Sequence, residues 1–189
     1  MKKALIVIVG LLLLAGVSSV ALAYTVSDTI GVKVTVTGNL SVSITEEEYQ
    51  FGTLSANFTS VSTSAVTVTN DSDGYTEDYQ MKATNTTSWT LAATQGEDTF
   101  CLAAQFSTSQ PSNADGSWTD DDLTTSDQPC SADTFGNGTA GEAGIDVPAN
   151  AGTGSDRSLW FRIKTPSTVK TGAGTEQTST VTVTAQQST

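Results

Sequence analysis

The sequence predicts an all-β fold, an antiparallel β-sandwich, from three observations. Several short segments alternate apolar and polar residues, which is the period of a half-buried strand. Ser and Thr make up 55 of the 189 residues, and many Thr residues alternate with Val, which suits a pleated strand. No helical period follows the first 23 residues, so no crossover helix is available for a parallel sheet. Immunoglobulin-like Greek-key or jelly-roll-like connections are expected, and an up-and-down barrel is the alternative.

The expected strands start near residue 32 and are separated by turn residues. Gly38-Asn39 lies between the first two, either as a hairpin turn or as a bulge within one longer strand. Trp89 and Trp160 lie within strand patterns, where a large ring is expected in the core. In chain order the expected strands are Val32–Thr37, Leu40–Ile44, Tyr49–Leu54, Ala65–Thr69, Tyr75–Ala83, Trp89–Ala92, Phe100–Phe106, Ser158–Lys164 and Thr178–Thr184.

The first 23 residues have the pattern of a secretory signal peptide. Two lysines precede an apolar run over residues 4–17, and Ala21-Leu22-Ala23 forms a small-residue cleavage pattern. The run is shorter than the ~20 residues that a membrane-spanning helix needs. Cleavage before Tyr24 would leave residues 24–189 as a single domain without a membrane span. The expected location is outside the cytoplasm, secreted or on the cell surface.

The charge balance disfavours two classes of partner. Without the leader the chain has 6 basic and 20 acidic residues, hence a net charge of −14. Nucleic acids and anionic membranes both need basic patches, so neither is an expected partner.

A long connection, residues 107–154, is dominated by Gly, Asp, Ser, Thr and Asn and shows no sustained apolar period. Loops of this length are usually functional, stapled or disordered. Because an exported protein meets an oxidising compartment, Cys101 and Cys130 are expected to form a disulfide that staples this loop. Closing a loop of about 30 residues would stabilise the fold by roughly 3.5 kcal/mol.

Two segments carry a resemblance to known proteins. Phe51-Gly52-Thr53-Leu54, followed by Ser64-Ala65-Val66-Thr67-Val68-Thr69-Asn70, resembles the opening of bacterial immunoglobulin-like surface domains. The leader with a Thr/Val-rich first strand is similar to the camelysin group of secreted fibre-forming proteins. The resemblance implies a surface or fibre role. Some camelysin-like proteins are described as metalloproteases, but this sequence has no His and no H-E-x-x-H, so no catalytic residue carries over.

The absence of His also excludes the Ser-His-Asp, Cys-His and His-ligated zinc arrangements of common hydrolases. A glycosidase needs only two carboxylates, and Asp120, Asp121 and Asp122 near Trp118 offer them. Adjacent acids in a polar loop are usually solvated, so we expect no enzymatic activity.

The same loop holds the candidate ligand sites. Asp115, Asp120 and Asp122 supply oxygen ligands of the kind calcium prefers, with a solvated acidic loop as the alternative. No cofactor other than calcium is expected. Trp118 has polar neighbours and is expected to be exposed, where it would form a stacking platform for glycans.

Five asparagines begin N-x-Ser/Thr triplets, the acceptor pattern of N-glycosylation. In a chain so rich in Ser and Thr, chance accounts for most of these matches. The triplets begin at Asn39, Asn57, Asn70, Asn85 and Asn137.

These observations favour a non-catalytic structural subunit of an extracellular filament, sheath or surface layer, whose partners are further copies of itself. Val32, Val34 and Val36 form one face of a strand that is predicted to join a neighbour's sheet by β-strand addition. An ordinary edge strand of its own sheet is the alternative for this segment. A secreted carbohydrate-binding or adhesive module is the alternative function.

Overall fold

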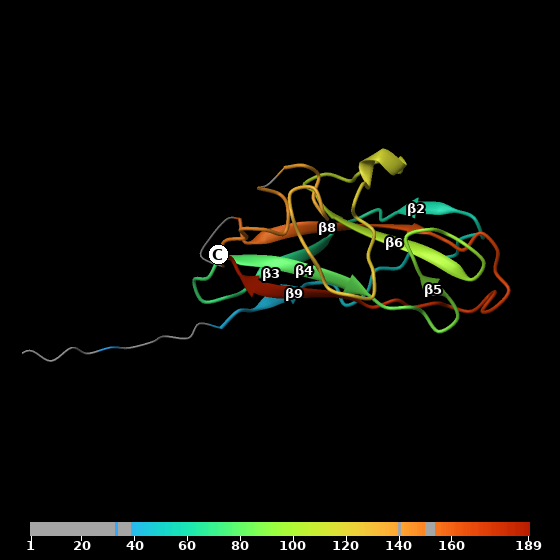
Figure 1. Cartoon of the computed structure of the whole chain (residues 1–189), viewed down its shortest axis with the longest axis horizontal. Coiled ribbons are helices and arrows are strands. Elements are labelled where there is room, and N and C mark those ends of the chain that lie inside the picture. Colours follow the sequence, from blue (N-terminus) through green and yellow to red (C-terminus); the bar gives the residue numbers. More distant parts are fainter. Residues whose placement is uncertain (1–32, 34–38, 140, 150–153) are drawn as a thin grey trace, which may run out of the picture. The chain divides into compact units, whose positions relative to one another are not determined.

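The computed structural model describes residues 33, 39–139, 141–149 and 154–189 (Figure 1). The chain divides into two compact units, Met1–Val36 and Thr37–Thr189, and the description below concerns the second. The expected leader lies outside the described residues, as does the strand expected over 32–37 apart from Lys33. The predicted assembly face of Val32, Val34 and Val36 therefore stays a prediction.

The described residues are nearly all β, as the alternating patterns predict. Their helical content is a single 3₁₀ turn, η1 (Asp115–Ser117). The strands are β1 (Val42–Ile44), β2 (Thr59–Val61), β3 (Val66–Asn70), β4 (Glu77–Ala83), β5 (Thr90–Leu91), β6 (Thr99–Phe106), β7 (Gln128–Pro129), β8 (Asp156–Lys164) and β9 (Val181–Gln187).

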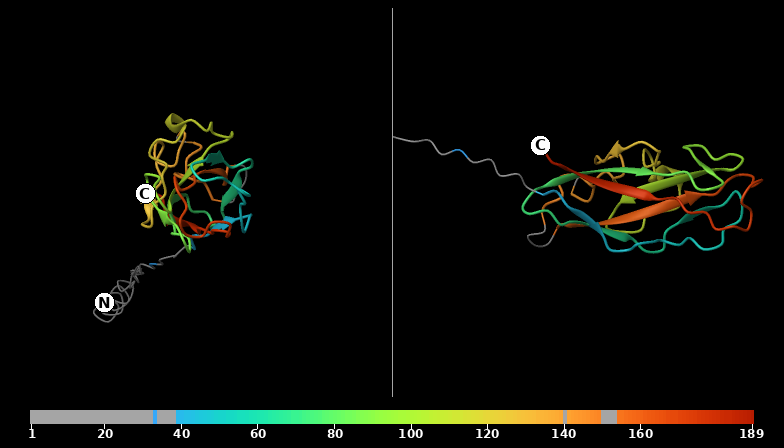
Figure 2. Two further views of the ribbon diagram at one scale, coloured as in Figure 1. Left: turned by 90° about the vertical axis from the view of Figure 1, so that its right-hand side faces the viewer. Right: turned by 90° about the horizontal axis from the view of Figure 1, so that it is seen from below.

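The strands form two sheets. The larger has the order β1-β3-β8-β6-β5, and β2 pairs with β8 beyond the end of β3. The smaller has the order β7-β4-β9. Figures 1 and 2 show β6 beside β8 in one sheet and β4 beside β9 in the other. The strand pairs are antiparallel except for β5 and β6, which run parallel over two residues, so the antiparallel expectation holds apart from this pair.

Both sheets contribute to one core. From β6, Phe100, Leu102, Ala104 and Phe106 face inward, and the ring of Tyr79 on β4 lies 6.0 Å from that of Phe106 between centroids. Met81 and Ala83 share the buried face of β4 with Tyr79, as their spacing predicts. The core is closed by residues from further elements: Val68, Leu91, Leu123, Cys130, Phe135, Val147, Leu159 and Val183.

Two expectations about strands and their faces are wrong. Tyr49–Leu54 forms no strand: Gly52 has a φ of +71°, and the Tyr49 hydroxyl accepts a hydrogen bond from the Thr63 backbone at 2.7 Å. Trp160 is not a core residue, because it lies on the face of β8 opposite to Leu159 and donates its indole N–H to the Ser107 carbonyl. Trp89 does pack against the core, beside Phe100.

The long connection closes one side of the two sheets. Beyond β5, the edge of β6 bonds to residues 121–123 and then to Phe135, whose carbonyl accepts from the Phe106 amide at 2.9 Å. The facing edge of β4 bonds to β7 and then to Gly144, whose carbonyl accepts from the Tyr79 amide at 2.7 Å. The backbone groups along this side are therefore satisfied by short segments of the same connection.

Gly144 is required for this closure. A Cβ atom there would lie 2.7 Å from the Phe106 ring and 3.1 Å from the Tyr79 ring. Only glycine lets the connection approach the two core rings this closely.

The Tyr79 hydroxyl is buried and has no hydrogen-bond partner among the described residues, so replacing it should stabilise the domain. An unpaired buried hydroxyl retains its desolvation cost. We expect Tyr79→Phe to raise the free energy of unfolding by about 1 kcal/mol in urea titrations. Tyr49→Phe is the control with the opposite sign, because it deletes a hydroxyl that accepts from the Thr63 amide. A clear loss of stability in Tyr79→Phe would contradict this assignment.

Candidate functional site

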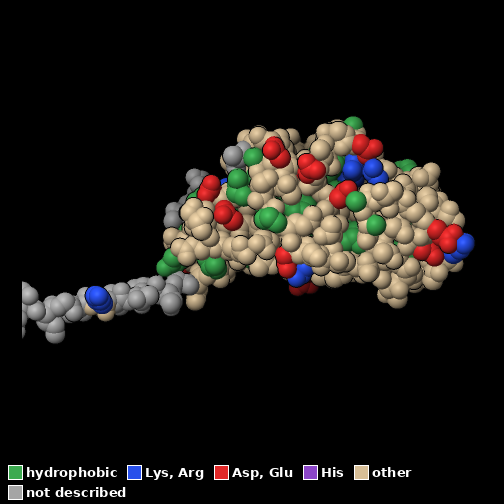
Figure 3. Space-filling view, viewed as in Figure 1, with side chains coloured by type: hydrophobic (Ala, Val, Ile, Leu, Met, Phe, Trp, Pro, Cys, Tyr) green, Lys and Arg blue, Asp and Glu red, His purple; other side chains and the backbone are tan. Residues whose placement is uncertain are grey.

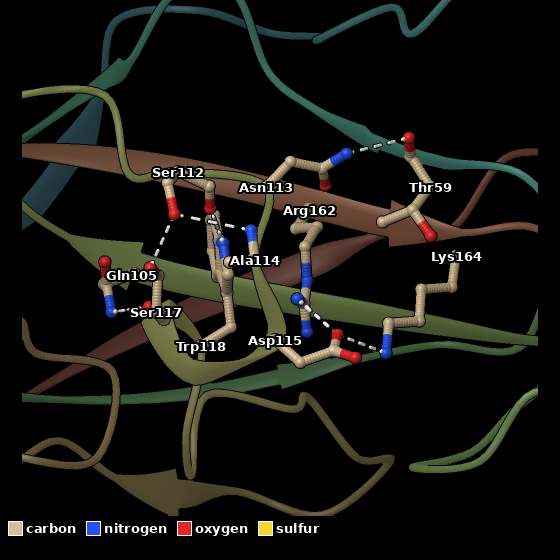
Figure 4. A network of polar contacts seen from close by, with 10 residues as sticks. All are labelled: Thr59, Gln105, Ser112, Asn113, Ala114, Asp115, Ser117, Trp118, Arg162 and Lys164. Atoms are coloured by element: carbon tan, nitrogen blue, oxygen red, sulfur yellow. Dashed lines mark hydrogen bonds and ion pairs between the residues drawn. The ribbon is translucent and has the colours of Figure 1, made fainter.

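The first part of the long connection is tied to the outer face of the larger sheet by an ionic network (Figure 4). Asp115 of η1 accepts from Arg162 Nη1 at 2.9 Å and from Lys164 Nζ at 2.7 Å, both on β8. The hydrogen bond and charge of Lys164, with the charge of Arg162, hold the pKa of Asp115 below its usual range. Since Arg162 is only 4% exposed, this contact supplies the counter-charge that a buried guanidinium needs.

Trp118 is part of this network, and the expectation that it is exposed is wrong. Its side chain is 3% exposed, and the Arg162 guanidinium lies 5.3 Å from its ring centroid. Its indole N–H donates to the Ser112 carbonyl at 2.7 Å. The polar neighbours in the sequence gave no sign that a cation on β8 covers the ring, so Trp118 cannot serve as a glycan platform in this conformation.

The three predicted calcium ligands do not converge. The Asp115 carboxylate is bound to Arg162 and Lys164. Asp122 lies at the edge of β6, where its backbone forms an antiparallel β-bridge with Ala103. Asp120 is exposed, with a φ of +61°. Within the described residues, no group of three or more acidic or Cys side chains is placed to hold a metal ion.

Asp121 is the site residue that the sequence did not distinguish from its neighbours. It is fully buried, and its Oδ2 accepts from Gln105 Nε2 at 2.8 Å while Oδ1 lacks a hydrogen-bond partner among the described residues. Burial raises its pKa to about 7, although the Gln105 hydrogen bond opposes that shift. The outward position of Gln105 in the β6 alternation was the available signal that a polar group lies above this strand.

A polar groove of about 580 Å³ lies between the two halves of the connection, with Gln105 at its floor. Hydroxyl, amide and carboxylate groups dominate its lining, and none of the described residues lining it is aromatic. Figure 3 shows acidic side chains spread over this face of the domain. The groove therefore offers hydrogen bonds but no ring on which a sugar could stack.

Cys101 and Cys130 are both free and buried, so the expected disulfide is not formed. The pleat of the sheet explains the correction. Cys101 alternates with the inward residues Phe100 and Leu102 of β6 and so faces outward, whereas Cys130 follows β7 of the other sheet and belongs to the core. Sequence separation and compartment cannot indicate on which face each thiol lies.

The free edge of the smaller sheet, strand β9, is a second candidate site. Among the described residues β9 pairs only with β4, through seven residues from Val181 to Gln187. It contains no charge and no Pro, two of the usual protections of an edge strand. The other terminal strands are shorter: β1 has three residues, and β5 and β7 have two each, one of them Pro129.

Apolar side chains are exposed next to this edge. β1 contacts β9, and Val42, the first residue of β1, packs against the core. Ile44 lies on the same face two residues further along, yet it is 40% exposed, as is Leu40 just before the strand. The side where β1 and β9 meet thus retains apolar surface that the described residues do not cover.

No protein family, curated protein or solved structure matches this chain. The part of the chain that is described contains no helix long and apolar enough to cross a bilayer.

Replacing Asp121 should change how stability depends on pH. Its pKa is raised on folding, so the folded state binds this proton more tightly and stability falls as pH rises from about 4 to 7. Asp121→Asn should remove that fall, and its stability relative to the native chain should increase by up to about 4 kcal/mol between pH 4 and 8. Denaturant titrations at both pH values measure it, with Asp120→Asn as the exposed control. Parallel pH profiles for Asp121→Asn and the native chain would contradict the prediction.

Both thiols should be free but unreactive in the folded protein. Burial raises the pKa of Cys101 and raises that of Cys130 to about 12, so little thiolate is present at neutral pH. We expect iodoacetamide to label neither cysteine in native buffer and both in denaturant without reductant. Intact mass spectrometry counts the adducts. An unlabelled denatured protein that gains two daltons on reduction would show a disulfide instead.

Proposed function

We propose that the chain is a non-catalytic structural subunit of an extracellular filament, sheath or surface layer that assembles by β-strand addition. The observation that carries the proposal is the β9 edge: seven residues long, uncharged, and paired only with β4 among the described residues. An edge of this kind is a template for another strand, and natural proteins normally block it when no partner is intended.

The side chains at this edge indicate what kind of strand fits. An incoming strand that hydrogen-bonds to β9 would lie beside β1 and cover the exposed side chains of Leu40 and Ile44. It would therefore present apolar residues at alternate positions toward the core and polar ones toward solvent. Backbone hydrogen bonds would supply affinity and the apolar contacts would supply register.

The chain itself contains a segment with this pattern, Val32, Val34 and Val36 alternating with Lys33 and Thr35. We propose that this segment of one copy adds to β9 of the next copy. A signal peptide that ends at Ala23 would place the donor close to the new amino terminus, free to leave its own domain. We also propose that the two sheets form an immunoglobulin-like or jelly-roll-like sandwich with Greek-key connections.

Deleting residues 24–37 separates donation from self-pairing. The remaining domain should still be exported but should form no fibres, and an added peptide of the deleted segment should bind to it. Negative-stain microscopy of cell-surface preparations and size-exclusion chromatography measure assembly. Fibres of normal length from the deletion variant, or a native chain that stays monomeric at every concentration, would overturn the proposal.

An acceptor variant tests the other half of the interface in the intact chain. Ile44→Asp places a charge beneath the incoming strand at a side chain that is 40% exposed, so the domain should fold while assembly is lost. Thr125→Asp is the matched control, because Thr125 is exposed on the long connection, at the β7 side of the smaller sheet and away from the β9 edge. Equal loss of fibres in both variants would indicate a general charge effect rather than a defined acceptor.

A further inference from the structure

The N-x-Ser/Thr triplets are more frequent than composition explains, so the expectation that chance accounts for most of them does not hold. The chain has seven asparagines, and five of them begin such a triplet. With 55 Ser and Thr among 189 residues, about two of seven would do so by chance. The fold presents these asparagines in different ways.

The structure excludes Asn70. Its side chain is fully buried, its Nδ2 donates to the carbonyls of Tyr75 and Val147 at 2.8 Å each, and its Oδ1 accepts from the Ser72 amide. A sugar on this nitrogen would remove two buried hydrogen bonds and displace the surrounding segment. Asn70 is a structural residue.

Asn57 is presented in the opposite way. It is exposed with a φ of +57°, its backbone N–H donates to the Pro166 carbonyl at 2.8 Å, and its Oδ1 accepts from Gln95 Nε2 at 3.2 Å. Its Nδ2 makes no hydrogen bond to any described residue. The following residue, Phe58, is fixed by hydrogen bonds in both directions with Thr165. The carboxamide is therefore held on a rigid backbone with its nitrogen free.

An exposed ring stands inside the same triplet. Phe58 is 49% exposed, the highest value among the exposed large apolar side chains of the described residues. Nothing in the described domain covers it. The apolar C–H face of a pyranose is suited to pack on an aromatic ring, which removes apolar area from water.

We propose that Asn57 is an N-glycosylation site and that the first sugar of its glycan covers Phe58. The proposal rests on the export that the proposed function requires. The donor is a lipid-linked oligosaccharide: Asn57 Nδ2 forms a bond to C1 of the first sugar, the bond from C1 to the lipid diphosphate breaks, and Nδ2 loses one proton. The lipid diphosphate is the leaving group, and no redox step is involved.

The remaining triplets are less well placed. Asn137 Nδ2 donates to Glu142 Oε2 at 2.6 Å, so its nitrogen is already bound. Asn85 follows β4 beside the start of β9, and Asn39 lies close to β1, so a glycan at either would crowd the edge where a strand is proposed to add. Among the described residues, none binds the Asn57 Nδ2, and Asn57 does not lie beside the β9 edge.

The test uses the full-length chain purified from the surface of its native host. Peptide mass spectrometry should find the peptide that contains Asn57 with an added oligosaccharide mass and the peptide that contains Asn70 without one. Thr59→Ser keeps the triplet and should keep the glycan, whereas Thr59→Val should reduce the glycopeptide at least tenfold. Hydroxyl-radical oxidation of Phe58 should rise in Thr59→Val but not in Thr59→Ser.

The outcomes distinguish a failure of the glycosylation proposal from a failure of the proposed filament assembly. Unmodified Asn57 in native fibres overturns glycosylation alone, and a glycosylated protein that stays monomeric overturns assembly alone. A glycan on Asn57 with unchanged Phe58 oxidation in Thr59→Val overturns the covering of the ring. Chain confined to the cytoplasm with an unmodified Asn57 overturns both.

Discussion

The fold depends on satisfying the backbone groups at the edges of two small sheets. Buried N–H and C=O groups must be paired, and a two-sheet structure that is not closed has an open edge at each side. On one side the chain meets this requirement with a single long connection, whose residues 121–123, 128–129, 135–136 and 144–147 bond in turn to β6 and β4. Leu123, Phe135 and Val147 enter the core from it, so the connection closes the edge and completes the core together.

The same connection explains why polar groups are buried above the larger sheet. β6 is buried on both faces, with Gln105 directed outward beneath the loop, and Arg162 of β8 lies close by. Each needs a partner once water is excluded, and the loop supplies Asp121 for Gln105 and Asp115 for Arg162. These contacts specify where an otherwise irregular segment sits, because an apolar surface alone would accept it in many registers.

Strands could be predicted wherever one face meets the core and the other meets solvent, as in β4 and β8, because alternation in sequence then reports burial directly. Prediction failed where a residue far away in the sequence determines whether a side chain is buried. The burial of Trp118 depends on Arg162, which is 44 positions away in the sequence. Whether Cys101 can pair with Cys130 depends on the face of β6 on which Cys101 lies. The Tyr49–Leu54 segment failed for a local reason, since Gly52 takes a left-handed φ that a strand cannot continue through.

The two sides of the domain differ in a way that bears on assembly. One is closed by the connection of residues 107–154, which includes buried polar anchors, whereas the β9 side shows an uncharged edge with Leu40 and Ile44 exposed beside it. In the proposed assembly each subunit has one acceptor edge and one donor segment and so makes a head-to-tail contact, which generates an open chain unless its rotation closes a ring. Because the opposite side offers no comparable edge among the described residues, growth through the proposed contact would be unbranched.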